Sequence, residues 1–342
     1  MGILSILEHN EQIKDFYHQL DRGIDNAKSP EELYRLVERV KSFGKPLKYN
    51  NTFIFIGIGG LLFLLMILSL MQGWNDYPLL LIFILIAVIL LSIFAFKRSR
   101  AMPNSSKKIF LKKVLFDNHL TPETFNGVEM ALALQQRFKD FIRGNDKREI
   151  KQLYSGLYQG SDHQFKYHYY QYHYVVRRVE TSRDSDGKIS RETVYDDYYR
   201  YGVFLDFPYV SGISLDKPGL FNGGVYKPAS NEFNRCYVVN GQSEMVAAKF
   251  LKPMIVSALT NAYSQYKELH FEFNAASQLC MSFNDNHLLD YTQQFTLEQP
   301  DLFLAELKEP KILTGLQAVL VHIEQLMTYS DNNFDTNREK GL

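Results

Sequence analysis

The chain has 342 residues, of which 38 are basic and 38 acidic, so its formal net charge is zero. This neutrality is not typical of a general nucleic-acid-binding protein, and we expect no nucleic-acid partner. Tyrosine (22) and phenylalanine (25) greatly outnumber the single tryptophan, which favours a β-rich region packed with aromatic rings.

The N-terminal segment, residues 1–50, is predicted to be helical and cytoplasmic. Apolar residues recur at helical spacing over Ile3–Leu20, and Arg22-Gly23 is expected to end this first helix. A second helix is expected to begin at Ser29-Pro30-Glu31-Glu32, because serine suits the cap and proline and acidic residues suit the first turn. Gly44 follows its last apolar residue.

Two apolar runs, Phe53–Met71 and Leu79–Phe96, predict a transmembrane helical hairpin over residues 51–97. Each run has about the length needed to cross roughly 30 Å of hydrocarbon. The second run has Leu, Ile, Val or Phe at 15 of its 18 positions. At roughly −0.3 to −0.6 kcal/mol per residue, these favour insertion by about −5 to −9 kcal/mol.

The charges beside the two runs predict how the hairpin is oriented. The connecting loop Gln72–Pro78 contains Asp76 and no Lys or Arg, whereas both outer flanks are basic. Positive charge marks the cytoplasmic side, so both termini are expected in the cytoplasm, with only the loop outside. The alternatives are a signal peptide, which should start near residue 1, and a buried hairpin of a soluble protein. The flanking basic residues are Arg35, Arg39, Lys41, Lys45, Lys48, Lys97, Arg98, Arg100, Lys107, Lys108, Lys112 and Lys113.

Residues 98–150 are predicted to form a cytoplasmic helical stalk. Ser105–Leu120 has the pattern of a basic amphipathic helix, either packed on other helices or lying on the membrane surface. Thr121-Pro122-Glu123 is expected to start another helix, and Met130–Ile142 continues the helical spacing up to Gly144.

The apolar period changes to two in residues 151–330, where an α+β domain with an antiparallel sheet is expected. Phe165–Val176 and residues 189–207 predict two long strands, joined by a turn over residues 183–188. The polar distal arms of this hairpin, residues 177–180 and 191–193, are expected to protrude and to offer a docking edge.

The remaining chain predicts a mixture of short elements. Asn234–Val239 is expected to be a strand, followed by helices on both sides of Lys252-Pro253. Leu269–Asn274, Gln278–Asn284 and His287–Asp290 suggest an antiparallel meander. Further elements are a short helix or strand at Leu302–Leu307, a strong amphipathic helix over Ile312–Met327 and a disordered tail over residues 331–342.

No group of residues in the sequence predicts a catalytic, cofactor or metal site. His163, His168 and His173 resemble a metal cluster, but alternation along a strand would turn His168 away from the other two. His163 and His173 would lie about 33 Å apart. The acidic pairs Asp184 with Asp186 and Asp196 with Asp197 are interpreted as solvated.

Other small motifs are also interpreted as structural. Gly57, Gly59 and Gly60 lie inside an apolar run and lack the Lys-Ser/Thr of a phosphate loop, which favours close helix packing instead. Ser155-Gly156 does not form a nucleophile elbow. Cys236 and Cys280 lack metal-like spacing and are expected to be reduced thiols.

The layout and several segments resemble an uncharacterised bacterial two-helix inner-membrane family that is often encoded near LemA-type proteins. This chain has Ala248-Lys249 where the family pattern would place an Arg-aromatic pair. The resemblance implies two membrane helices and a cytoplasmic α+β domain, and it implies no activity. The matching segments are Asn231–Val239, Gln242–Pro253, Leu279–Phe283 and Leu313–Leu326.

The sequence therefore predicts a membrane-anchored α+β protein whose cytoplasmic domain binds a protein partner or a second copy. Neither apolar run contains a charged residue, which argues against an ion or proton pathway through the hairpin. We expect a scaffold or regulator in envelope maintenance or stress adaptation, with the lipid bilayer as its other partner. A membrane-tethered enzyme acting on a lipid-linked or nucleotide substrate, and a subunit of a larger membrane complex, are the alternatives.

Overall fold

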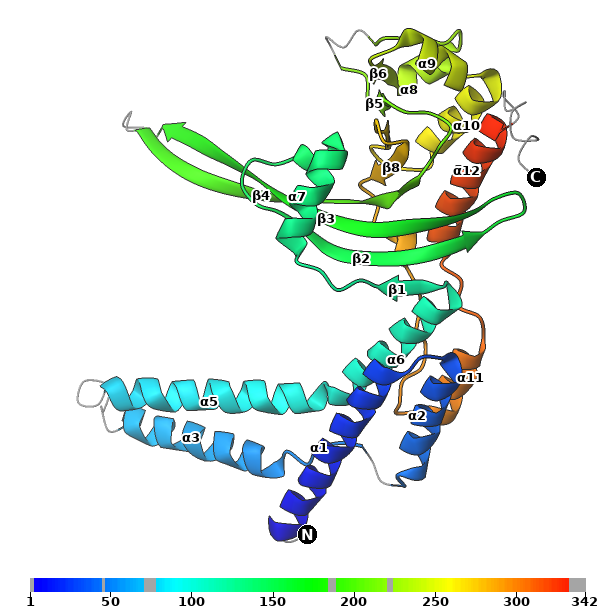
Figure 1. Ribbon diagram of the computed structural model, residues 1–342. Helices are drawn as coiled ribbons and strands as arrows, with labels where there is room; N and C mark the ends of the chain where they lie inside the picture. The colour runs from blue at the N-terminus through cyan, green and yellow to red at the C-terminus, as the bar shows by residue number, and fades with distance from the viewer. Residues whose placement is uncertain (1–2, 45–46, 71–77, 184–188, 220–223, 332–342) are drawn as a thin grey trace. The chain divides into compact units, whose positions relative to one another are not determined.

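A computed structural model describes residues 3–44, 47–70, 78–183, 189–219 and 224–331 (Figure 1). Tertiary contacts divide the chain into two compact units. The helical unit contains residues 1–117 and 291–311, and the sheet unit contains residues 118–290 and 312–342. Residues 291–311 therefore belong to a unit whose other members end at residue 117, and no sequence pattern marks this return of the chain.

Four helices form the packed part of the helical unit. The two predicted N-terminal helices are confirmed, although the first continues past Gly23 to Asn26. A side chain at Gly23 would meet Leu36 at 2.7 Å, so this glycine allows the first two helices to approach closely. The four helices are α1 (Ile3–Asn26), α2 (Pro30–Ser42), α6 (Ala101–Asp117) and α11 (Pro300–Lys308).

The returning segment is fixed to these helices by hydrogen bonds. Tyr34 of α2 donates to the Leu307 carbonyl oxygen at 3.2 Å, and the backbone N–H of Leu297 donates to Ser106 of α6 at 3.0 Å. The expected amphipathic helix after the apolar runs is thus a packed helix, because its Ile109 and Phe110 are fully buried.

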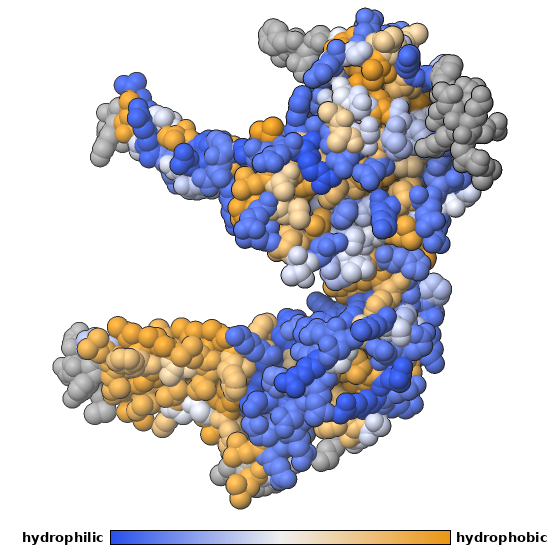
Figure 2. All heavy atoms as spheres, in the orientation of Figure 1, coloured by the Kyte–Doolittle hydropathy of each residue, from blue (hydrophilic) through white to orange (hydrophobic). Residues whose placement is uncertain are grey.

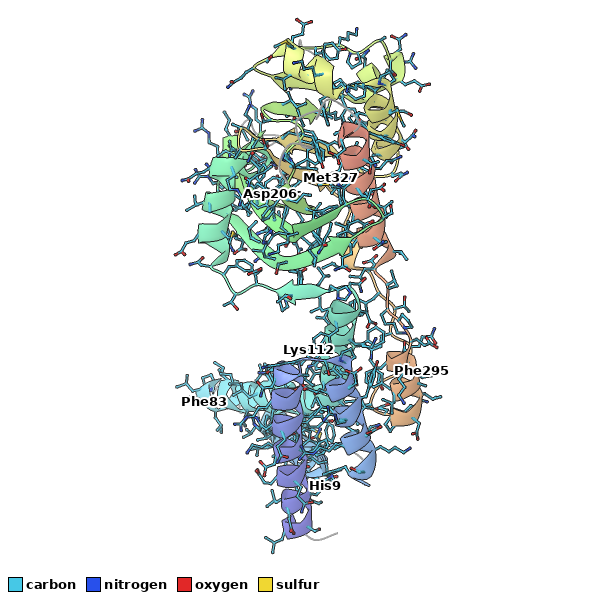
Figure 3. The ribbon with its side chains drawn as sticks, turned by 45° about the vertical axis from the view of Figure 1, so that its right-hand side comes forward. His9, Phe83, Lys112, Asp206, Phe295 and Met327 are labelled. Atoms are coloured by element: carbon cyan, nitrogen blue, oxygen red, sulfur yellow. The ribbon has the colours of Figure 1, made fainter. Side chains whose placement is uncertain are left out.

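The two apolar runs form α3 (Thr52–Leu70) and α5 (Pro78–Ser99), which pack against each other. Both are long and apolar enough to cross a membrane. No residue of α3 is buried, and in α5 only Leu81, Ile84 and Ala95 are. Apolar side chains cover the visible face of the pair (Figure 2), and Phe83 extends outward from α5 (Figure 3).

The sheet unit is built on an eight-stranded sheet in which every pair of neighbouring strands is antiparallel. The order across the sheet is β1-β2-β3-β4-β8-β7-β5-β6. Together with its helices, this sheet confirms the α+β class. The strands are β1 (Leu120–Pro122), β2 (Arg148–Gln159), β3 (Gln164–Arg183), β4 (Ile189–Asp206), β5 (Ile213–Asp216), β6 (Val238–Gly241), β7 (His270–Phe273) and β8 (Gln278–Phe283).

Helices cover the two faces of the sheet unequally. Helix α7 (Gly127–Arg137) and the 3₁₀ turn η1 (Lys139–Ile142) cover one face over β2, β3 and β4, whereas α12 lies against the opposite face (Figure 1). The elements of the sheet unit after β5 include α8 (Asn231–Cys236), α9 (Glu244–Phe250), α10 (Pro253–Tyr263), η2 (His287–Leu289) and α12 (Thr314–Asp331).

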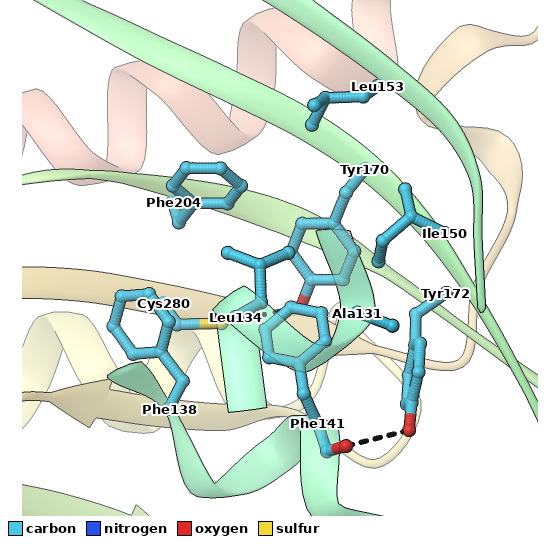
Figure 4. Packing of buried hydrophobic residues seen from close by; sticks show 10 residues of the cluster. All are labelled: Ala131, Leu134, Phe138, Phe141, Ile150, Leu153, Tyr170, Tyr172, Phe204 and Cys280. Atoms are coloured by element: carbon cyan, nitrogen blue, oxygen red, sulfur yellow. Dashed lines mark hydrogen bonds between the residues drawn. The ribbon is translucent and has the colours of Figure 1, made fainter. Parts of the chain in front are cut away.

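The core beneath α7 is a cluster of aromatic and aliphatic side chains (Figure 4). Phe141 of η1 packs against the rings of Tyr170 and Tyr172, and Tyr172 donates a hydrogen bond to the Phe141 carbonyl oxygen at 2.8 Å. Tyrosines at alternate positions of β3 thus build one face of the sheet, as the aromatic composition predicted. Burying each such ring removes about 150–250 Å² from water.

Three short predicted elements are wrong. Residues 120–122 form β1 beside β2 instead of starting a helix, and α7 begins later, where Asn126 caps it. Residues 231–236 are helical because Ser230 accepts the N–H of Phe233 at its N-terminus. Residues 287–289 form a 3₁₀ turn rather than the last strand of a meander. Local hydrogen bonds or strand partners outweigh the apolar spacing in each case.

Candidate functional site

The long β3–β4 hairpin extends beyond its neighbouring strands. Strand β2 accompanies β3 only as far as Tyr174, and β8 accompanies β4 only from Tyr201 to Asp206. Beyond these points β3 and β4 pair with each other alone, as far as Arg183 opposite Ile189. We call residues 177–183 and 189–195 the arm. Its seven paired positions span about 20 Å at roughly 3.3 Å per residue.

One face of the arm carries exposed apolar side chains interspersed with Arg177, Arg183 and Arg191. Side chains alternate along a strand, and the register places Val179, Ile189, Tyr195 and Tyr199 on the same face. The first three are 62%, 61% and 56% exposed. We call these four residues the docking face. The opposite face is polar: Arg178 forms ion pairs with Asp196 at 2.7 Å and Glu180 at 3.0 Å.

A cluster of charged side chains lies beside Tyr199, where the docking face meets the rest of the sheet. His173 Nε2 lies 2.6 Å from Asp197 Oδ1, and His173 Nδ1 lies 3.2 Å from Glu149 Oε1. The imidazole ring packs against the Tyr199 ring at 4.8 Å between centroids. Burial would raise the pKa of Glu149, but hydrogen bonds from Lys147, Lys151 and His173 lower it to about 2. This carboxylate is therefore ionised at neutral pH and fixes the imidazole.

A second charged network lies on the other face, where the arm joins the sheet. Arg200 and Asp140 are both 1% exposed and form an ion pair at 3.3 Å. Arg200 also donates to Ser282 Oγ at 2.7 Å and to Asn284 Oδ1 at 2.8 Å. Burial would raise the pKa of Asp140, but the charges of Arg200, His270 and Arg143 hold it well below its usual range. Asp140 is thus a fixed anion.

His270 and Asp216 continue this network towards the edge strand β6. His270 Nδ1 lies 2.9 Å from Asp216 Oδ1, and Asp216 Oδ2 accepts hydrogen bonds from Ser214 and Asn240. Burial would lower the pKa of His270, but Asp216, Glu272 and Asp140 raise it to about 9. At neutral pH this histidine is a protonated donor and not a general base. Ser214 donates to Asp216 rather than to His270, so these three side chains do not form a nucleophilic relay.

The structure separates the histidines that looked like a cluster. His168 stacks on Phe204 on the α7 face, whereas His173 faces the opposite side beside Tyr199. His163 precedes β3 and lies 3.3 Å from Asp331. Within the described part of the chain, no group of three or more His, Cys, Asp or Glu side chains could hold a metal ion.

The remaining sequence candidates are also placed apart. Asp196 and Asp197 point to opposite faces, as predicted, with Arg178 and His173 as their respective partners. Asp184 and Asp186 lie outside the described residues.

The small-residue and cysteine motifs fall in structural positions. Gly57, Gly59 and Gly60 lie within α3, and a side chain at the last two would meet open space, so close packing does not require them. Gly156 lies in β2 beside Tyr167. Cys280 is buried beside the Tyr170 hydroxyl, and Cys236 ends α8; both are free thiols.

Sequence reasoning missed the buried charges Asp140, Arg200 and His270. One local signal was present, because His270-Phe271-Glu272-Phe273 alternates polar and aromatic residues within a strand. Such alternation predicts one polar and one apolar face. Arg200 has no such signal, since its partners lie 60 or more residues away in the chain, and the nearby Arg143 does not reveal that Asp140 is buried.

No family model, curated protein or solved structure matches this chain.

Proposed function

We propose that this protein is a membrane-anchored scaffold or regulator of the bacterial inner membrane. In this proposal α3 and α5 cross the bilayer, both termini are cytoplasmic, and the sheet unit binds a protein partner through the docking face of the arm. Envelope maintenance or stress adaptation is the process that such a scaffold would serve.

The anchor is supported by the exposure of α3 and α5. A core helix of a soluble protein with this composition would be buried, whereas only Leu81, Ile84 and Ala95 are buried in these two helices. A helix satisfies its own backbone hydrogen bonds and therefore suits a lipid environment. Lys97 and Arg98 follow the last apolar turn of α5, and Arg98 lies over the rings of Tyr49 and Phe94. Basic and aromatic side chains of this kind are typical of the membrane interface.

The docking face is the observation that carries the binding role. An isolated two-stranded ribbon is at best marginally stable in water, yet three large side chains of the arm and the adjacent Tyr199 are exposed instead of buried. Tyrosine is among the residues that contribute most to protein interfaces. The polar opposite face and the ion pairs of Arg178 would keep the free arm soluble.

The binding role can be tested with the full-length chain, solubilised from native membranes at native expression. In the arm variant, Val179, Ile189 and Tyr195 are replaced by serine. A control replaces the exposed Val128 and Leu132 of α7 by serine, which removes exposed apolar side chains elsewhere in the sheet unit. We expect a protein that co-purifies with the wild type and the control to be reduced at least about tenfold with the arm variant.

Two further readouts complete this test. Unchanged near-ultraviolet circular dichroism of the arm variant would show that the sheet unit remains folded. Co-expression of two differently tagged copies distinguishes a second copy of the chain from another protein. Equal recovery of every partner by the arm variant and the wild type would contradict the proposal.

A further inference from the structure

A cleft of about 650 Å³ lies within the sheet unit, between the C-terminal end of α7 and strands β5, β6 and β7. Its volume lies within the range of sites for small ligands, roughly 300–1,000 Å³. Side chains that donate or accept hydrogen bonds line much of it, including Gln135, Gln136, Asn240, Gln242 and Asn274. The cleft is separate from the docking face of the arm, and its role does not depend on the proposed function.

The cleft is the uncovered, polar end of a sheet face that is apolar under α7. On β2 and β3 this face presents Leu153 and Tyr170, which α7 and η1 bury. Antiparallel pairing continues the same face through Ser282 of β8 to His270 of β7. The aromatic neighbours of His270 point to the opposite face, where Phe271 packs against His322 of α12. Polar side chains therefore form the floor of the cleft.

His270 lines the cleft with one ring nitrogen bonded and the other unpartnered. The side chain is only 7% exposed, and Nδ1 is held by Asp216. The buried Nε2 has no hydrogen-bond partner within the described residues. A buried donor without an acceptor is uncommon in folded proteins and costs free energy.

The only acidic side chain paired with Nε2 in the described structure lies too far away for a hydrogen bond. Glu272 Oε2 is 3.7 Å from Nε2 and already accepts the backbone N–H of Lys139 at 2.7 Å. Nε2 has almost no accessible surface, so a ligand oxygen reaches it only when neighbouring side chains move aside. One such oxygen can then lie at about 2.8 Å from both atoms, because they are separated by less than twice that distance. Such an oxygen must accept from Nε2–H and donate to Glu272, and a hydroxyl group does both.

We propose that this cleft binds a small, neutral, polyhydroxylated molecule of the sugar or polyol class. One ligand hydroxyl bridges His270 Nε2 and Glu272, and the carboxamides of Asn240 and Gln242 bind further hydroxyls. Arg137 and Lys139 also line the cleft, but an anion bound between Nε2 and Glu272 is disfavoured because it would lie against the carboxylates of Glu272 and Asp216. A metal ion is disfavoured because the donor set lacks a third suitably placed ligand.

Calorimetric titration of the full-length chain in lipid nanodiscs, without glycosidic detergent, tests this site. The probes are D-ribose, D-glucose and glycerol, with inorganic phosphate as the anionic comparison. In His270→Asn the amide nitrogen can replace Nδ1 and retain Asp216, but the Nε2 donor is lost. In His270→Gln the amide nitrogen reaches the Nε2 position. We expect at least one sugar or polyol to bind, His270→Asn to weaken it at least about tenfold, and His270→Gln to retain most of the affinity.

A second pair of variants keeps the test informative if substitutions at His270 unfold the sheet unit. Gln242→Ala changes an exposed residue of the cleft and should weaken binding several-fold, whereas Lys249→Ala, at a different cleft, should leave it unchanged. The proposal is overturned if none of the three hydroxylated probes binds, if phosphate binds in their place, or if Gln242→Ala leaves the affinity unaltered.

Discussion

The helical hairpin of α3 and α5 and the arm of β3 and β4 both expose large apolar side chains, but they do so with different backbones. Each helix satisfies its own N–H and C=O groups, so only its side chains meet the surroundings. The two strands of the arm form backbone hydrogen bonds with each other along one edge only. Among the described residues, the outer edge of β3 has no strand partner beyond Tyr174, and that of β4 has none before Tyr201.

This difference decides which environment suits each hairpin. Lipid accepts the helices, because no backbone group is left without a partner, but it would not accept the open edges of the arm. The arm also alternates apolar and charged side chains, whereas α3 and the apolar part of α5 contain no ionisable residue. We therefore propose a membrane as the environment of the helical hairpin and a protein surface as that of the arm.

The largest effect should come from charging the helical hairpin. Aspartate at Leu85 and Ile89 in α5 adds roughly 6–8 kcal/mol to the insertion free energy of that helix, which nearly cancels its favourable total. We expect the variant to lose carbonate-resistant association with membranes or to be degraded. Val179→Asp in the arm is the control and should remain fully membrane-bound. Equal extraction of both variants from membranes by carbonate would contradict the proposal that only the helical hairpin lies in the membrane.

Breaking the buried ion pair at the root of the arm should have the next largest effect. Arg200→Met leaves the buried Asp140 with Arg143 as its remaining ion-pair partner among the described residues and removes the donor to Ser282 and Asn284, which should lower the free energy of unfolding of the sheet unit by about 3–5 kcal/mol. The matched exposed change, Arg178→Met, removes ion pairs with Asp196 and Glu180 and should change the free energy of unfolding little, because water screens exposed charges. Denaturant unfolding monitored by near-ultraviolet circular dichroism compares the two. Similar losses in the free energy of unfolding would mean that the pair of Arg200 and Asp140 does not support the arm.

The buried His270 should make the stability of the sheet unit depend on pH. The pKa of His270 is raised to about 9 when folded, from an ordinary value near 6.5 when unfolded. Its stabilisation, on the order of 3 kcal/mol, is complete below about pH 6.5 and is lost as pH rises through about 9. Thermal unfolding between pH 6 and 10 should show this decline, and His270→Asn should flatten it. A wild-type profile as flat as that of the variant would contradict the assignment.

The smallest expected changes in stability concern one glycine from each hairpin. A side chain at Gly202 of β4 would lie 2.1 Å from the Met281 carbonyl oxygen of β8, so Gly202→Ala should cost about 1–3 kcal/mol. A side chain at Gly59 of α3 meets open space, and Gly59→Ala should be neutral or slightly stabilising. Unfolding midpoints of the two variants provide the measurement. Loss of stability at Gly59 would instead indicate that another helix packs there.

The predictable part of this fold lies in features that repeat along the chain. Unbroken apolarity predicted α3 and α5, and alternation predicted β3 and β4 with the correct opposite faces for Asp196 and Asp197. Contacts between distant residues could not be predicted in this way. Tyr34 contacts Leu307, which is 273 positions away, and Asp140 contacts Arg200, which is 60 positions away, only because of the tertiary fold. The cleft was missed for the same reason: His270, Asp216 and Asn240 come from three strands whose order in the sheet differs from their order in the chain.

Position-specific photo-crosslinking in intact cells tests most directly whether the arm is the docking element. A photoreactive amino acid is placed at Tyr195 on the docking face or at Leu132 on α7, in the full-length chain. The account predicts a discrete crosslinked adduct in the membrane fraction from position 195 and none from position 132. No adduct from position 195, or the same adduct from both positions, would contradict it.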